Sequence, residues 1–172
     1  MSAPEEEIFL AAVNLLMAGE RWDEVVSLIE PRLAEEPLGH ELVWKLGWAH
    51  FQLGNHGDAL QHLQRAVEAG PVSAAYFGSL GMTLSRLEEH DAAELWLLRA
   101  LAIHDTVVSR TGLALAYQRR GLVDVAEAVH LEGMRLAPGD AARIEAYADF
   151  LRDLGRDEEA ARLLGEVSAP AS

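Results

Sequence analysis

The chain has 172 residues, of which 50% are hydrophobic and 24% are charged, and its formal net charge is −14. This acidity excludes the basic surface by which proteins attract nucleic acids and anionic membranes, so we expect neither as a partner. The absence of cysteine excludes disulfides and thiol chemistry, and the acidic N-terminus does not resemble a signal peptide, so we expect a cytoplasmic protein.

Apolar residues at helical spacing begin the chain. In residues 6–39, Phe9 and Val13 share one face of a first helix, and Val25 and Ile29 share one face of a second. The strand-like alternation of apolar and polar residues does not occur, and β-branched residues are scattered. The pattern therefore predicts helices throughout.

An aromatic stripe marks residues 40–73. Trp44, Trp48 and Phe51 lie at positions i, i+4 and i+7 of the first helix, so they share one face. The second helix of this segment covers only the other face, on which Gly47 lies. Three interpretations stay open: the aromatic residues pack on neighbouring helices, the N-terminal helix or a second copy covers them, or they bind a partner.

The remaining segments become more polar. Trp96 in residues 74–106 lies among leucines, and we interpret it as a packing residue. Residues 141–172 end in a helix whose apolar residues have no obvious cover in the sequence. These residues are Leu163, Leu164 and Val167. A helical array needs a polar surface at its end, so this pattern predicts homo-oligomers formed through the C-terminal helix pair.

Small residues recur at a period of about 34 residues. They are Gly47, Gly81, Ala114 and Ala148 in the first helices, and Ala59, Ala93, Ala126 and Ala160 in the second helices. Small side chains let two helix backbones approach closely. Gly54, Gly121 and Gly155 follow the first helices, where a left-handed residue ends a helix, and Glu88 replaces this glycine in the third segment.

This register resembles the tetratricopeptide repeat (TPR) family, and the resemblance covers nearly the whole chain. It implies an all-α fold, a right-handed α-solenoid of about five helix-turn-helix repeats with ten helices. We expect a single domain over residues 1–172. Its repeats are expected at approximately 6–39, 40–73, 74–106, 107–140 and 141–172.

The resemblance also implies a binding groove, because the first helices of TPR arrays line a concave surface with four positions of each repeat. The expected partner-binding residues are Leu10, Asn14, Met17, Trp44, Trp48, Phe51, Gln52, Met82, Arg86, Leu115, Gln118 and Arg119. The fifth repeat adds Glu145, Asp149, Arg152 and Asp153. The predicted groove thus changes from apolar, through mixed and basic, to acidic along the chain.

Two features of this groove bear on its ligand. Arg86 and Arg119 lie one repeat apart and suit a carboxylate or backbone carbonyls, while Gly78 leaves room for a bulky side chain of a partner. One subgroup of the family binds the acidic C-termini of heat-shock chaperones through lysine and asparagine side chains. Trp44 and Trp48 stand at positions where that clamp needs such residues, so we expect a different ligand.

Catalytic chemistry finds no support in the sequence. No two of the seven histidines have the spacing of metal ligands on a helix, and the chain has no phosphate loop, dinucleotide fingerprint or nucleophile elbow. We expect no enzyme, no cofactor and no metal. Three hypotheses follow: an adaptor that binds a peptide or helix of a partner protein, a small acidic chaperone that holds an apolar client for a secretion system, and a self-assembling scaffold.

Overall fold

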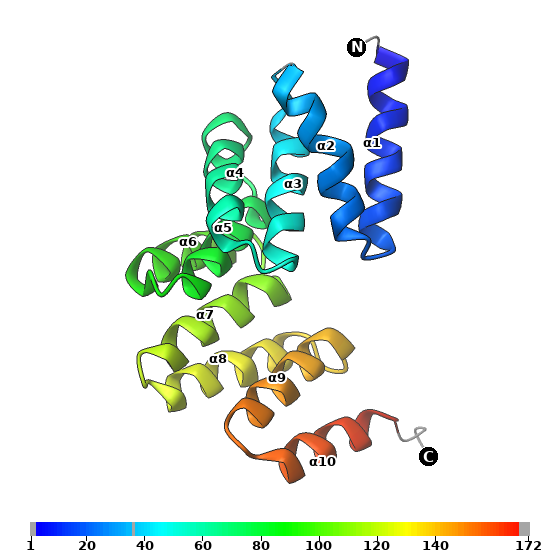
Figure 1. The fold of residues 1–172 in the computed structure, drawn as a ribbon. Helices are drawn as coiled ribbons and strands as arrows, with labels where there is room; N and C mark the ends of the chain where they lie inside the picture. Colours follow the sequence, from blue (N-terminus) through cyan, green and yellow to red (C-terminus); the bar gives the residue numbers. More distant parts are fainter. Residues whose placement is uncertain (1–2, 36, 169–172) are drawn as a thin grey trace.

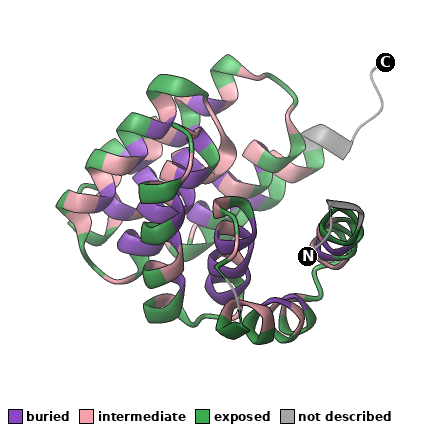
Figure 2. Cartoon of the chain, turned by 90° about the horizontal axis from the view of Figure 1, so that it is seen from above, coloured by how far each residue is buried: buried purple, intermediate pink, exposed green. Residues whose placement is uncertain are grey.

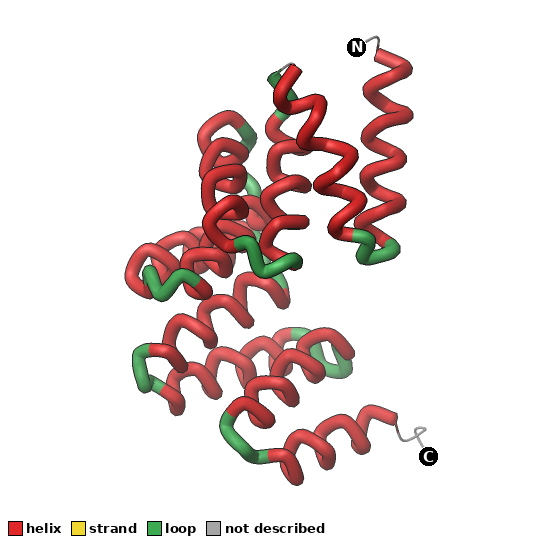
Figure 3. The backbone as a smooth tube through the Cα atoms, in the orientation of Figure 1, coloured by secondary structure: helices red, strands yellow, loops and turns green. Residues whose placement is uncertain are grey.

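The structure is a computed structural model that describes residues 3–35 and 37–168, and these residues form helices joined by short turns, with no strand (Figures 1 and 3). In chain order the helices are α1 (Ala3–Ala18), α2 (Trp22–Glu35), α3 (His40–Gln52), α4 (His56–Ala69), α5 (Ala74–Arg86), α6 (His90–Ile103), α7 (Val107–Arg119), α8 (Val123–Leu136), α9 (Ala141–Asp153) and α10 (Asp157–Ser168).

Consecutive helices form antiparallel pairs, and the pairs stack into a solenoid. Each odd-numbered helix packs on the even-numbered helix that follows it, and each even-numbered helix contacts the next pair. The two ends of the chain lie at opposite ends of the stack (Figure 1). The axes of α1 to α4 are close to vertical in this view, whereas those of α7 and α8 are much closer to horizontal, so the array twists along its length.

Left-handed residues connect the two helices of each pair. Gly54, Gly121 and Gly155 have φ angles of 80°, 77° and 73°, which confirms the prediction from the sequence. Glu20 and Glu88 occupy the corresponding turns with φ angles of 54° and 66°. A side chain with a Cβ atom is strained in this region, so these two glutamates cost stability where a glycine would not.

The small residues of the register lie where the two helices of a pair cross. A Cβ atom added at Gly47 would lie 2.8 Å from Leu63 Cγ, and one added at Gly81 would lie 2.5 Å from Leu97 Cγ. Both leucines are completely buried. The predicted close approach of the helix backbones is therefore confirmed at these two crossings, and no larger side chain fits there.

A cluster of charged side chains joins the third, fourth and fifth pairs. Asp105, which stands where other repeats have proline, accepts hydrogen bonds from Arg110 Nε at 2.9 Å and from Arg143 at 3.0 Å. The hydrogen bond from Arg110 and the weaker one from Arg143 hold the pKa of Asp105 below its usual value, against the opposing effect of burial. One carboxylate thus fixes α7 and α9 to the end of α6.

Candidate functional site

The aromatic stripe of α3 packs largely against other residues of the same chain. The Trp44 indole stacks on Tyr76 with ring centroids 5.6 Å apart, and its Nε1 donates to Ser79 Oγ at 3.1 Å. Trp48 stacks on Phe51 at 5.0 Å, and Phe51 itself is only 8% exposed. Both tryptophans are half-buried. The structure places Phe51 in the core, and Trp44 packs on α5 as the first of the three interpretations predicted.

The middle of the predicted groove is closed, because α5 and α7 lie closer together than the other neighbouring first helices. A Cβ atom at Gly78 would lie 2.7 Å from Ser109 Oγ, and Ser85 Oγ donates to the Gly112 carbonyl at 3.1 Å. Met82 is 8% exposed. The expectation that Gly78 leaves room for a partner is wrong, since α7 fills this space. Met82 likewise belongs to the core.

The N-terminal groove positions differ among themselves in exposure. Leu10 and Met17 are half-buried and pack against the core between α1, α2 and α3. Asn14 and Gln52 are exposed. These residues are not brought together with the predicted positions of the C-terminal half.

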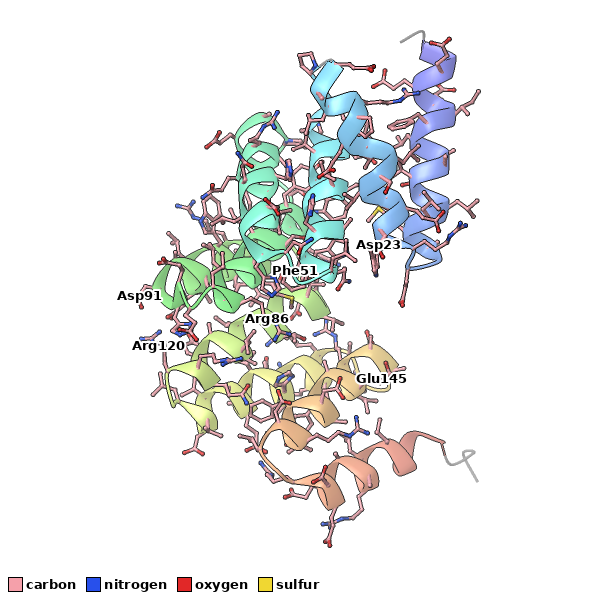
Figure 4. All side chains as sticks on the ribbon, in the orientation of Figure 1. Asp23, Phe51, Arg86, Asp91, Arg120 and Glu145 are labelled. Atoms are coloured by element: carbon pink, nitrogen blue, oxygen red, sulfur yellow. The ribbon has the colours of Figure 1, made fainter. Side chains whose placement is uncertain are left out.

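The C-terminal half of the concave surface contains a hollow of about 800 Å³ between α7 and α9. Its lining residues are Arg86, Thr111, Leu115, Gln118, Arg119, His130, Ala142, Glu145, Ala146, Asp149, Phe150 and Asp153. Seven of the predicted groove residues therefore line the same hollow: Arg86, Leu115, Gln118, Arg119, Glu145, Asp149 and Asp153. Figure 4 shows Arg86 in the middle of the molecule below Phe51, and Glu145 on α9.

The charges around this hollow have opposite signs on its two sides and do not pair across it. Arg86 and Arg119 come from α5 and α7, and in the part of the chain that the structure describes neither lies within ion-pair distance of a carboxylate. On α9, Glu145 and Asp153 likewise have no cation within that distance among the described residues. A third acid of this helix, Asp149, pairs with its own neighbour Arg152 at 2.7 Å.

Arg86 and Arg119 differ from most other arginines of the C-terminal half, which are paired with a carboxylate. Those that hold a carboxylate are Arg110, Arg120, Arg135, Arg143, Arg152 and Arg156. Arg120, the immediate neighbour of Arg119, pairs with Glu94 at 2.7 Å. It lies beside Asp91 at the edge of the molecule opposite Glu145 (Figure 4). The hollow therefore holds two cations that the chain itself leaves unneutralised.

His130 of α8 forms part of the floor of the hollow and was missed by the sequence analysis. Its ring packs on Phe150 with centroids 5.0 Å apart and on Tyr147 at 5.7 Å. Burial, with a further contribution from Arg110, lowers the pKa of His130 to about 4, so the imidazole is neutral at pH 7. The available signal was its position, because the register places leucines at the equivalent residues 63 and 97.

The last helix pair is where the sequence predicts contacts between copies of the chain. Leu163 and Leu164 are half-buried and pack against the core of the last two pairs, and the side chain of Val167 lies outside the described residues. Exposed positions of α10 are mainly charged or small: Asp157, Glu158, Glu159, Ala161, Arg162 and Gly165. The two leucines are thus partly covered from within the chain, and self-association through the C-terminal pair stays a prediction.

The first helix carries an exposed apolar face. Ile8 and Leu15 of α1 are 72% and 73% exposed, with Ala11 and Ala12 exposed between them. Figure 2 shows that most of α1 is exposed. The N-terminal end of the array therefore also presents an apolar surface.

None of the helices in the described part of the chain is both long enough and apolar enough to cross a membrane. Histidine, aspartate and glutamate side chains in the described ranges do not gather into a group of three or more that could hold a metal ion.

Comparison with known proteins defines the class of this chain. The family model described as tetratricopeptide repeat matches residues 10–74 and 45–107, which together span more than half of the sequence. The chain therefore belongs to the TPR family, and its fold is one typical of protein–protein interaction modules. No curated protein matches it significantly.

Solved structures of two proteins share this fold over nearly their whole length. TTC0263, a thermophilic TPR protein of Thermus thermophilus, is 22% identical, with a TM-score of 0.78 over 94% of this chain and 89% of that one. A crystal structure of MamA is 22% identical, with a TM-score of 0.64 over 90% of this chain and 91% of that one. At these identities the similarity concerns the fold alone.

Proposed function

We propose that this protein is an adaptor that binds a segment of a partner protein in the hollow between α7 and α9. One observation carries the proposal: residues from the first helices of three successive repeats, Arg86, Leu115 and Glu145 among them, line a hollow of about 800 Å³. This volume is within the range of about 300–1,000 Å³ of sites that enclose small ligands or a few side chains. It suits a peptide or a helix face rather than a folded domain.

The lining has the composition of a binding site for a polar segment. Leu115 and Phe150 supply apolar surface at the floor, while Arg86 and Arg119 stand exposed at the rim. Arginine and aromatic residues are frequent among the residues that dominate binding energy. Charged rims favour such a segment over the wholly apolar client that a secretion chaperone would hold.

Photo-crosslinking tests this proposal. A benzophenone side chain at Leu115 is expected to capture a reproducible partner peptide in the native cell. The matched control is a benzophenone at Leu98, which is 48% exposed on α6 and does not line the hollow. Capture at residue 98 with none at residue 115 would place the binding surface on the second helices and contradict the proposal.

A second candidate is a self-assembling scaffold formed by a second copy on α1. The exposed residues Ile8, Ala11, Ala12 and Leu15 are symmetric about the midpoint of their stretch. In an antiparallel pair, Ile8 of each copy therefore faces Leu15 of the other, and the alanines meet at the crossing, as a two-fold contact requires.

The charges of α1 weaken this arrangement rather than support it. Its first turn is acidic, with Glu6, and Arg21, which follows its other end, is already ion-paired with Glu24. Burial of only two large side chains per copy implies a weak dimer, below the roughly 1,200–2,000 Å² of a stable interface.

Sedimentation equilibrium tests the second candidate. We expect a concentration-dependent dimer that strengthens with salt, because salt screens the repulsion between two copies of net charge −14. Leu15→Glu is expected to abolish the dimer, whereas Leu98→Glu, at an exposed site on α6, should leave it unchanged. A monomer at the highest soluble concentration, at both low and high salt, contradicts this second candidate.

A further inference from the structure

We infer that the hollow selects a segment of mixed charge, with an acidic side chain on one edge and a lysine or arginine on the other. This inference rests on the proposed function and names the chemistry of the partner. Its basis is the separation of charge across the hollow, with Arg86 and Arg119 on one side and Glu145 and Asp153 on the other.

The separation matters because these groups have no partners within the described residues of the chain. Arg86 and Arg119 present guanidinium groups that bind carboxylates with two parallel hydrogen bonds. Glu145 and Asp153 present carboxylates to a cation. A guest with one sign of charge satisfies one side and is repelled by the other, so only a guest with both signs satisfies both sides.

Three of the charged residues occupy equivalent positions of the repeat. Arg86, Arg119 and Asp153 occupy the same position in three successive repeats, so they form one row along the rim, and the sign of this row changes between α7 and α9. The guest segment is therefore expected to lie along the hollow between α7 and α9. Its acidic edge faces Arg86 and Arg119, and its basic edge faces Glu145 and Asp153.

The floor between the charged sides is neutral. His130 is only 6% exposed and carries no charge at pH 7, so it offers one N–H donor and one acceptor nitrogen. Leu115 and Phe150 lie beside it in the lining. A small apolar or hydroxyl side chain of the guest fits between its two charged residues.

Synthetic helical peptides of about 16 residues, long enough for marginal helicity, test the inference on the full chain by fluorescence anisotropy. All share one alanine- and leucine-rich face. The mixed probe has Glu on one edge and Lys on the other, and two further probes carry Glu on both edges or Lys on both edges. The mixed peptide is expected to bind at least about tenfold more tightly than either other peptide, which corresponds to one pair of charges.

Charge reversal identifies the residues responsible. Arg86→Glu with Arg119→Glu should weaken binding of the mixed peptide by at least about tenfold and make the all-Lys peptide the preferred one. Glu145→Lys with Asp153→Lys should make the all-Glu peptide preferred. All four residues are exposed, so the helical melting curve should stay that of the wild type.

Two controls change the net charge in the same directions at a distance from the hollow. Arg162→Glu and Glu158→Lys alter exposed residues of α10 that do not line the hollow, and they should leave all three affinities unchanged. Free lysine and free glutamate at about 10 mM, a concentration below the dissociation constant expected for a single exposed charge pair, should not displace the mixed peptide.

The possible failures have distinct meanings. Equal binding of the three peptides, together with crosslinking at Leu115, overturns the charge selection while the adaptor function stands. Full displacement of the mixed peptide by the free amino acids would show that the hollow binds a small molecule rather than a protein segment. Absence of both peptide binding and crosslinking at Leu115 overturns the adaptor function itself.

Discussion

The two halves of the concave surface carry the same helix positions but present different surfaces. In the N-terminal half, Trp44 reaches across to the next repeat and is held there by Tyr76 and Ser79. In the C-terminal half, the equivalent position Thr111 is short, and the space between α7 and α9 stays open. Trp44 thus fills the space between α3 and α5, whereas the shorter Thr111 leaves the space between α7 and α9 open.

Acid is expected to destabilise the C-terminal half more than the N-terminal half, because His130 lies in the C-terminal half. Its pKa is about 4 in the folded chain and near 6.5 when unfolded, so the unfolded chain takes up the proton first as the pH falls. Stability that is fully present above pH 6.5 is therefore lost between pH 6.5 and about 4, by up to about 3 kcal/mol. Urea melts across this range measure the loss.

His130→Leu is the matched variant for this measurement, because leucine stands at the equivalent buried positions 63 and 97. The variant should be less sensitive to pH in this window. A smaller slope should remain, since burial also lowers the pKa of His62. An unchanged slope in His130→Leu would assign the acid sensitivity to other groups.

The closed middle of the groove is tested by Gly78→Leu. A Cβ atom here would lie 2.7 Å from Ser109 Oγ, so a larger side chain must push α5 and α7 apart. We expect a loss of about 2–3 kcal/mol in the free energy of unfolding. Gly57→Leu is the control, because no atom lies within contact distance of a Cβ at Gly57. Equal stability of both variants would mean that α7 yields and that the middle is open to a guest.

Alanine substitutions compare the two halves directly. Trp44→Ala removes a ring stack and a hydrogen bond between α3 and α5, and should cost about 2 kcal/mol of stability. Leu115→Ala, at a half-buried residue beside open space, should cost less than about 1 kcal/mol but weaken peptide binding. Denaturant melts and peptide titrations of both variants provide the comparison, and the opposite ranking would show that the open site lies at the tryptophans.

The sequence predicted the fold because the fold depends on contacts within each repeat. Gly47 and Gly81 must be small wherever a first helix crosses its own second helix, and that requirement recurs with the period of the array. A left-handed glycine such as Gly54 is likewise required by the turn within its own repeat. Because such requirements recur in every repeat, they produce a periodic pattern in the sequence.

The open site was predicted less completely because it depends on the spacing between repeats. The sequence makes Trp44 a candidate binding residue, whereas the structure shows that its ring stacks on Tyr76, which lies 32 residues further on in the sequence. The register contains no measure of the distance between α5 and α7, or between α7 and α9. His130 is the exception, since a histidine in a row of buried leucines is visible in the sequence itself.

The smallest expected effect concerns the turn between the two halves. Glu88 follows α5 directly after the rim residue Arg86 and Leu87, and has a φ angle of 66°, where repeats two, four and five have glycine. Glu88→Gly should relieve the strain of a left-handed residue with a Cβ atom, and the greater freedom of glycine in the unfolded chain should offset part of this gain. The net effect should be a stabilisation of about 1 kcal/mol.

Glu89→Gly is the matched control for Glu88→Gly, because it makes the same chemical change one residue later, where φ is −81°. There, glycine relieves no strain and should only lower stability. Thermal melts of the two variants decide the matter. If Glu88→Gly is no more stable than Glu89→Gly, the turn is unstrained, and the glutamate costs nothing at the junction between the closed and the open half.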